Sequence, residues 1–368
     1  MNKRMEALAN SLGALYSTYG YESYTMRKFE EYALYLGNKD FLISDRVLTF
    51  TDTDGKLMAL KPDVTLSIIK NTRDIPGQLQ KMYYRETVYR PGNSGFREIM
   101  QVGLECMGAV DDYCILEVLL LAVKSLRTVS ANCVLDVSHM GLLAALLDQL
   151  QLKGEIRNQI TEAIGSKNAH TVRALCESVG APWEALSKLA RLSGRAESVL
   201  PELEAIFGNL PELTQLRSLT AALEAVGCGD CINIDFSVVN DMRYYNGIVF
   251  RGFVEGVPAG VLSGGQYDAM MAKMHRRGKA IGFAVYPELL DRLGEEQPAE
   301  TPEAALVYSA DADLCSLSKA VEALTGRGIR VRVLPAGADT AAYETVYTLE
   351  GNEVHQNAYY CFAQGSPW

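Results

Sequence analysis

The strongest constraint on the fold is a pair of strand-like stretches that flank a marked turn. Residues 81–90 and 98–107 lie on either side of Pro-Gly-Asn-Ser-Gly at 91–95, a combination that favours a chain reversal. A second hairpin is predicted over residues 47–60, around the turn Asp54-Gly55. Such hairpins pair neighbouring strands antiparallel, so we predict an α+β fold on an antiparallel sheet with flanking helices.

Helices are expected on both sides of these hairpins. They are predicted over residues 5–16, 64–71 and 111–127, the first because apolar residues repeat at helical spacing. From about residue 141 to 226, Leu and Ala recur at helical spacing without a convincing strand, which predicts an inserted helical domain. Strands then return over three segments: 233–239, 245–254 and 258–262.

The C-terminal part predicts a separate small module. Residues 294–302 are polar and contain proline, as in a linker. A strand, a helix and a strand are expected beyond it, and the last thirty residues show little periodicity, so the α/β module looks short or truncated. The predicted domains are two parts of one core, 1–140 and 228–295, the inserted helical domain, 141–227, and the C-terminal module, 302–368.

Charge and composition narrow the functional classes. The 368 residues carry 35 Lys and Arg against 45 Asp and Glu, a net charge of −10. This argues against broad nucleic-acid binding, which depends on cations that neutralise phosphates. The start lacks the apolar core of a signal peptide, and the longest apolar run, 118–123, is too short to span a bilayer. Eight scattered cysteines suit reduced thiols. We therefore predict a soluble, cytoplasmic protein without a membrane partner.

Three weaker motifs have ordinary structural explanations. Cys228 and Cys231 have the spacing of a redox pair or half a zinc site, but no second pair accompanies them, so inert thiols are favoured. The segment Ser263-Gly264-Gly265 would suit a phosphate cradle, although a tight strand-to-helix turn requires the same residues. The four histidines lie near no pattern that suggests a nucleophile.

A more specific set of polar residues is spread over four places. Asp63 and Thr65 end a strand, Arg90 precedes the turn, and Gln101 and Glu105 share one strand face beyond it. Two tyrosine-bearing segments, 243–247 and 264–268, follow later in the chain. Carboxylates suit an ammonium or imidazole N–H and an arginine suits a carboxylate, so together these residues would fit a small zwitterion.

The same residues resemble the catalytic core of histidyl-tRNA synthetase, a class II fold. The matching segments are Phe50–Asp52, Leu60–Thr65, Gly95–Glu98, Gln101–Glu105, Tyr244–Phe250, Ser263–Asp268 and Ala280–Ala284. The resemblance covers roughly residues 5–130 and 230–293 and implies a class II synthetase-like sheet. Carried over residue by residue, it implies a histidine-binding site of Asp63, Thr65, Arg90, Gln101, Glu105, Tyr245 and Tyr267.

This chain departs from the synthetase pattern at positions that bind ATP. Where the family has arginines, this chain has Asn240, Gln266 and Leu289, and Gly92 replaces a glutamate of the second motif. In synthetases such arginines hold the phosphates of ATP, and losing two of them implies a rate lower by very roughly 10²–10⁴-fold. Asp63 is the shorter homologue of a glutamate, so it keeps the charge but not the reach.

A synthetase-like fold without its ATP-binding residues is similar to the regulatory subunits of ATP phosphoribosyltransferase. This resemblance implies a non-catalytic protein, with no catalytic residue, metal or cofactor. Its partner would be the short-form catalytic subunit, which it would activate and place under feedback control by L-histidine, in the first step of histidine biosynthesis. A self-dimer is also expected from the first class II motif. The loop from Arg90 to Arg97 is shorter than the synthetase loop that reaches the tRNA, so tRNA is not expected as a partner.

Two alternatives remain open at this point. The first is a divergent histidyl-tRNA synthetase, which would have to replace the missing arginines at Asn240 and Leu289 with residues from elsewhere. The second is a stand-alone histidine sensor that serves another process.

Overall fold

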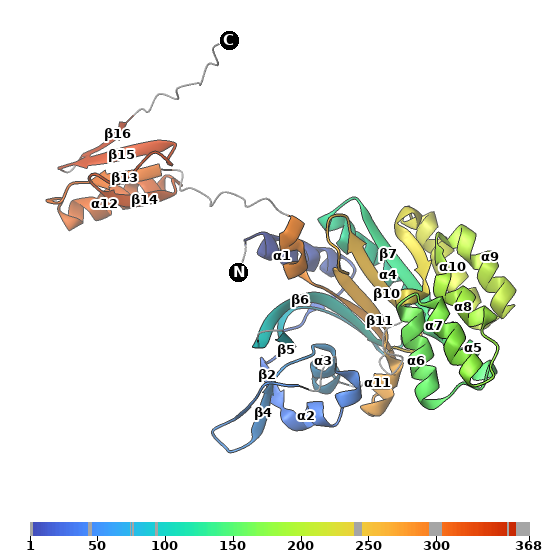
Figure 1. Ribbon diagram of the computed structural model, residues 1–368. Coiled ribbons are helices and arrows are strands. Elements are labelled where there is room, and N and C mark those ends of the chain that lie inside the picture. The colour runs from blue at the N-terminus through green and yellow to red at the C-terminus, as the bar shows by residue number, and fades with distance from the viewer. Residues whose placement is uncertain are drawn as a thin grey trace, which may run out of the picture. The chain divides into compact units, whose positions relative to one another are not determined.

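The chain forms two compact units in the computed structural model, Met1–Leu293 and Gly294–Trp368, and each is considered by itself (Figure 1). No helix among the described residues is long and apolar enough to cross a membrane. The predicted linker at 294–302 lies outside the described residues. The structure describes residues 3–42, 46–73, 75, 77–92, 95–238, 245–293, 304–351 and 353–357.

A nine-stranded sheet in the order β1-β5-β6-β12-β11-β10-β7-β9-β8 forms the frame of the first unit. Its strands are β1 (Glu22–Ser23), β5 (Leu79–Gly92), β6 (Gly95–Gly108), β7 (Cys133–His139), β8 (Ser193–Gly194), β9 (Ile232–Asp235), β10 (Ile248–Val254), β11 (Leu262–Gln266) and β12 (Lys279–Val285). The β1–β5 and β7–β9 pairs are parallel and the others antiparallel, which confirms the predicted sheet type for most of its width. Strands β1, β7, β8 and β12 were not predicted.

The two predicted hairpins are both present. Strands β5 and β6 pair from Leu79–Gly108 out to Gly92–Gly95, and they form the long curved ribbon of Figure 1. The second hairpin joins β3 (Thr49–Thr51) to β4 (Leu57–Leu60), and β2 (Phe29–Glu31) completes a three-stranded sheet. Its turn contains Gly55 at φ +79°, a conformation that glycine adopts without steric cost.

The helices of the first unit cover opposite faces of the central sheet. Helices α1 (Lys3–Thr18) and α4 (Asp112–Val129) bury one face, where Leu104 of β6 is completely enclosed. The other face carries α3 (Thr65–Asn71), α11 (Asp268–Lys273) and their own apolar cluster with Met107. Two further short helices are α2 (Tyr32–Leu36) and η1 (Lys39–Phe41). Because alternate β6 residues face opposite sides, Glu105 lies on the α3 face.

Six helices occupy the segment predicted to be helical, beside β7 and β9 (Figure 1). They are α5 (Met140–Gln149), α6 (Gly154–Gly165), α7 (Ala169–Ser178), α8 (Glu184–Arg191), α9 (Ala196–Phe207) and α10 (Pro211–Ala225). Their buried side chains belong to the same apolar cluster as the α1 and α4 face of the sheet. The prediction of no strand here was wrong at β8, because two residues between α8 and α9 pair with β9.

His139 connects the sheet to these helices. Its environment predicts that its contribution to the stability of the folded state decreases at acidic pH. It caps α5 by accepting the Gly141 N–H at Nδ1 (3.0 Å), and its Nε2 lies 2.9 Å from Oε1 of Gln215. Burial lowers the pKa of His139. The unfolded chain therefore binds a proton first as the pH falls, so the folded state loses stability below about pH 6.5.

We expect the contribution of His139 to the free energy of unfolding to fall by up to about 1.4 kcal/mol per pH unit below that point. His139→Asn keeps a capping oxygen without a titrating ring. Urea titrations of both proteins at pH 7.5 and 5.5 would therefore measure this loss as the difference between wild type and variant, because other groups that titrate in this range contribute equally to both. An equal change with pH in both proteins would show that His139 is not the group responsible.

The second unit contains a four-stranded sheet in the order β14-β13-β15-β16. Its elements are β13 (Ala304–Tyr308), α12 (Leu314–Gly326), β14 (Val331–Pro335), β15 (Thr345–Glu350) and β16 (Glu353–Asn357). The predicted strand, helix and strand are confirmed. The expectation of little structure in the last thirty residues was wrong as far as Asn357, because β15 and β16 pair there.

Candidate functional site

A cavity of about 450 Å³ opens on the α3 face of the central sheet. All seven residues of the predicted histidine site line it: Asp63, Thr65, Arg90, Gln101, Glu105, Tyr245 and Tyr267. They come from α3, β5, β6 and the segments around β10 and β11, so only the folded sheet brings them together. Further lining residues that were not predicted include Arg251, Gly260, Ser263, Gly282 and Tyr286.

Glu105 is the most deeply buried carboxyl group of the cavity. It is 2% exposed and accepts hydrogen bonds from the Thr65 hydroxyl (2.9 Å) and the Tyr267 hydroxyl (2.6 Å). Burial raises its pKa to about 8, although these two hydrogen bonds oppose the shift. A ligand N–H that could bond the carboxylate would favour its ionised form.

Glycines on the neighbouring strands make room for this carboxylate. Gly282 of β12 lies opposite Glu105, and a Cβ there would fall 1.8 Å from Glu105 Oε2. A Cβ at Gly103 would fall 2.5 Å from the hydroxyl of Tyr84. Gln101, Gly103 and Glu105 therefore share the cavity face of β6, as their alternation predicted.

The expectation that Ser263-Gly264-Gly265 ends a strand was wrong, because these residues lie inside β11. A Cβ at Gly264 would fall 2.3 Å from the carbonyl oxygen of Gly282, and one at Gly265 would fall 2.7 Å from the ring of Tyr245. The glycines thus allow close approach of a strand and an aromatic ring. Nothing in their surroundings requires a phosphate.

Asp63 and Arg90 are partly committed to the protein itself. One Asp63 oxygen accepts the Leu66 N–H (2.9 Å) and so caps the start of α3, while the other lies 3.9 Å from Arg90 Nη2. Arg90 Nε also donates to the carbonyl of Pro62 at 2.9 Å. Burial raises the pKa of Asp63, and Arg90 opposes that rise. Both residues line the cavity, but their charges already interact with each other.

The two tyrosine-bearing segments are joined by side-chain hydrogen bonds. The side-chain amide of Asn246 accepts the backbone N–H of Asp268 at Oδ1 (2.9 Å) and donates from Nδ2 to the Asp268 carboxylate (3.2 Å). The other Asp268 oxygen accepts the Ala280 N–H at 2.8 Å. Gln266, at the position of a synthetase arginine, accepts the Ile248 N–H at 2.7 Å. These bonds hold Tyr245 and Tyr267 beside the cavity.

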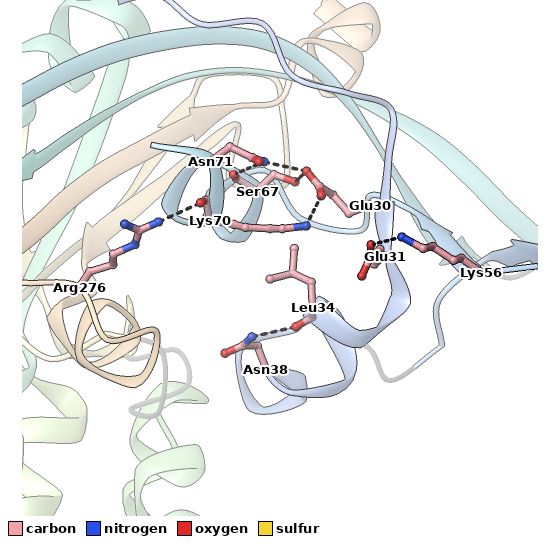
Figure 2. A network of polar contacts seen from close by, with 9 residues as sticks. All are labelled: Glu30, Glu31, Leu34, Asn38, Lys56, Ser67, Lys70, Asn71 and Arg276. Carbon is pink, nitrogen blue, oxygen red and sulfur yellow. Dashed lines mark hydrogen bonds and ion pairs between the residues drawn. The ribbon is translucent and has the colours of Figure 1, made fainter. Parts of the chain in front are cut away.

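Two ionic contacts, the first of them enclosed and the second with an exposed lysine, position α3 and the loop before it. Lys61 is completely buried, and its Nζ lies 2.5 Å from Glu86 Oε2. Figure 2 shows the second group, in which Glu30 accepts hydrogen bonds from Lys70 (2.6 Å) and Asn71 (2.7 Å) of α3. The Lys-Pro-Asp sequence at 61–63 has the composition of an exposed turn, so sequence patterns gave no signal of this burial.

The remaining sequence motifs have packing roles where they are described. Cys228 and Cys231 are buried beside Arg127, with Cys133 Sγ 3.7 Å from Cys231 Sγ, and no described group of three His, Cys, Asp or Glu residues is arranged to hold a metal. Leu289 lies in the helical turn η4 (Pro287–Leu293) and packs against the main apolar cluster. Asn240 lies outside the described residues.

Comparison with known proteins places the chain among synthetase-like proteins. The histidyl-tRNA synthetase family matches residues 1–290. The ATP phosphoribosyltransferase regulatory subunit of Clostridium kluyveri is 26% identical over 299 residues, covering 77% of this chain and 76% of the relative. That of Moorella thermoacetica is 29% identical over 333 residues (86% and 84%), and a histidine–tRNA ligase of Methanosphaerula palustris is 26% identical over 304 residues (80% and 72%).

Solved structures show the same fold. An ATP phosphoribosyltransferase regulatory subunit/histidyl-tRNA synthetase of Bacillus halodurans has a TM-score of 0.78 at 21% identity, covering 94% of both chains. A chain of the ATP phosphoribosyl transferase (HisG:HisZ) complex from Thermotoga maritima has a TM-score of 0.62 at 19% identity, covering 76% of this chain and 96% of that one. Since the family match spans most of the sequence, this protein belongs to the histidyl-tRNA synthetase family, and it resembles the ATP phosphoribosyltransferase regulatory subunits within that fold.

Proposed function

We propose that the chain is the non-catalytic regulatory subunit of an ATP phosphoribosyltransferase. The observation that carries this proposal is the cavity, because all seven residues that match the histidine pocket line it. At the same time Leu289, where the synthetases have an arginine, is partly buried and packs against the apolar core. The similarity to several proteins named as regulatory subunits supports the same role.

The partner in this proposal is the short-form catalytic subunit, bound in a hetero-oligomer. The Thermotoga maritima structure is described as a complex of this kind, which supports the assignment for this chain. Domains 1–140 and 228–295 would carry the histidine cavity, with 141–227 and 302–368 as accessory domains. The seven described cysteines are all free thiols, as suits a cytoplasmic location.

Histidine is the proposed effector, and the cavity chemistry suits it. The imidazole and ammonium groups of histidine carry N–H donors, and the buried Glu105 carboxylate and Gln101 amide offer acceptors. For feedback control, histidine must bind one state of the complex more tightly than the other, because a ligand with equal affinity shifts no equilibrium. The ratio of the two affinities would then limit how far histidine can shift the complex toward its inhibited state.

Reconstitution with the catalytic subunit tests the proposal. Phosphoribosyl transfer to ATP would be assayed under three conditions. The catalytic subunit would be present by itself, together with this chain, or together with this chain and L-histidine. We expect activity to require the chain and to fall with histidine. No activation by the chain would refute the regulatory role.

The alternative role as a histidyl-tRNA synthetase is supported by the similarity to a histidine–tRNA ligase. It is tested in parallel by histidine-dependent charging of tRNA by the purified chain. Charging at an enzyme-like rate would replace the regulatory proposal. A chain that binds histidine but neither activates the transferase nor charges tRNA would be a stand-alone sensor.

The self-dimer is supported by an exposed apolar surface on the three-stranded sheet. Phe29 and Phe50 are 43% and 36% exposed, and their rings meet edge to face with centroids 5.4 Å apart. Leu36 and Leu57 are exposed as well. An exposed pair of aromatic rings that contact each other suits a protein interface.

Phe50→Glu is therefore expected to convert a dimer to a monomer at micromolar concentration, because a carboxylate would be desolvated in the interface. Size-exclusion chromatography with light scattering would measure the mass. Leu314→Glu, at a 78% exposed position in the second unit, is the matched control and should leave the mass unchanged. A wild-type monomer would contradict the dimer itself.

A further inference from the structure

The cavity contains a second arginine that the sequence motifs did not indicate. The arginine expected to meet a ligand carboxylate, Arg90, already contacts Asp63 and the carbonyl of Pro62. Arg251 of β10 also lines the cavity. The cavity therefore has an acidic part at Asp63 and Glu105 and a basic part at Arg251.

Strand register places Arg251 on the same face of the sheet as Glu105. Arg251 lies opposite Ser263 of β11, which lies opposite Ala284 of β12, which in turn lies opposite Gly103 of β6. Residues directly opposite in neighbouring strands share a face, and Gly103 is on the face of Glu105. Arg251 is thus three strands across from Glu105 and displaced by two residues along the strand.

This separation suits a ligand of amino-acid length. At about 4.8 Å between strands and about 3.3 Å per residue, the two Cα atoms are roughly 16 Å apart. Because the long arginine side chain and the glutamate side chain both line this one cavity, their charged ends lie closer together than their Cα atoms. The two groups would then hold opposite ends of one molecule.

Among the described residues the guanidinium of Arg251 makes no hydrogen bond, and no carboxylate lies within 4.0 Å of it. Its charge interacts at longer range with Asp136, the opposite residue on β7, and opposes the rise that burial causes in the pKa of that carboxyl. Its aliphatic stem packs under Gly260, where a Cβ would fall 2.7 Å from the stem. The hydroxyls of Ser263 and Tyr286, 3.0 Å apart, line the cavity beside it.

We propose that Arg251 binds the carboxylate of the amino acid that fills this cavity, while Glu105 receives an N–H group at its other end. This assignment rests on the proposed function, in which the cavity takes L-histidine. A guanidinium can bond a carboxylate through two parallel N–H groups, which fixes both its position and its orientation. Arg251 is then a binding residue for the effector and has no role in chemistry.

Calorimetric titration of the full chain with L-histidine and L-histidinol tests the proposal. Histidinol has a hydroxymethyl group in place of the carboxylate and keeps the amine and the imidazole. Wild-type protein should bind histidine about 10–100-fold more tightly than histidinol, which corresponds to about 1.4–2.7 kcal/mol. In Arg251→Gln the histidine affinity should fall to that of histidinol, and the histidinol affinity should stay unchanged.

Two further variants control for folding and for general charge. Arg251→Lys should keep part of the preference for histidine, because it keeps the charge but loses the paired donors. Arg195→Gln, at an exposed arginine before α9, should change neither affinity. Thermal unfolding of each variant shows whether it is folded, and the comparison of two ligands on wild-type protein needs no variant at all.

The outcomes separate this proposal from the function on which it rests. If wild-type protein binds both ligands equally, or if Arg251→Gln keeps the full preference, the role of Arg251 is wrong and the regulatory function stands. If the wild-type chain binds neither ligand, the role of Arg251 and the histidine cavity are both wrong. Activation of the transferase, measured separately, decides whether the regulatory function fails.

Discussion

Replacing Lys61 with methionine is expected to lower the free energy of unfolding of the first unit by about 3–5 kcal/mol. Lys61 is completely buried, and Glu86, only 11% exposed, is its ionic partner at 2.5 Å. Burial lowers the pKa of Lys61, and the contact with Glu86 opposes that change. Methionine would leave the Glu86 charge enclosed with one remaining partner among the described residues, the N–H of Met26.

Urea unfolding of the wild type and three variants would measure this effect. Lys56→Met breaks an exposed ion pair with Glu31 and should cost less than about 1 kcal/mol. The double variant Lys61→Met with Glu86→Leu removes both charges and should recover much of the loss. If Lys61→Met costs no more than Lys56→Met, the buried ion pair does not stabilise the loop before α3.

Replacing Glu105 with glutamine is expected to stabilise the empty protein and to weaken its binding of histidine. The folded chain keeps the Glu105 proton up to about pH 8, whereas the unfolded chain loses it near pH 4.5. Between these values the unfolded state binds fewer protons, so stability falls as the pH rises. A neutral amide of the same shape avoids this cost, and the gain should reach about 1–3 kcal/mol at pH 8 and vanish near pH 5.

The same change removes the charge that would receive the N–H group of the ligand. Histidine affinity is expected to fall about 10–100-fold, which calorimetric titration at pH 8 would measure. Glu98→Gln, at an exposed position of the same strand, is the matched control and should change neither quantity. A less stable Glu105→Gln protein at pH 8 would contradict the raised pKa, and unchanged affinity would place the ligand elsewhere.

The elements that could be predicted from the sequence are those that local chemistry determines. The turn around Asp54-Gly55 and the long hairpin follow from glycine conformation and from strands adjacent along the chain. The shared face of Gln101, Gly103 and Glu105 follows from the two-residue period of a strand. The seven residues of the candidate site follow from motif resemblance, which carries long-range information that periodicity lacks.

The features that were missed depend on strand register between distant segments. Gly282 makes room for the Glu105 side chain because β12 pairs with β6. This pairing places it opposite a residue more than 170 positions earlier in the sequence. The burial of Lys61 depends on Glu86 from another strand, which no spacing along the chain indicates. β8 is a strand only because β9 pairs with it.

Local sequence therefore set the hairpins, the helices and the faces on which polar side chains lie, because turn preferences and the periods of helices and strands act within a few residues. The tertiary structure alone decided which groups meet. It enclosed the Glu105 carboxylate and thereby raised its pKa, and it brought Arg251 to the same cavity across three strands. Burial and electrostatic interaction depend on distances in space, which only the folded sheet determines.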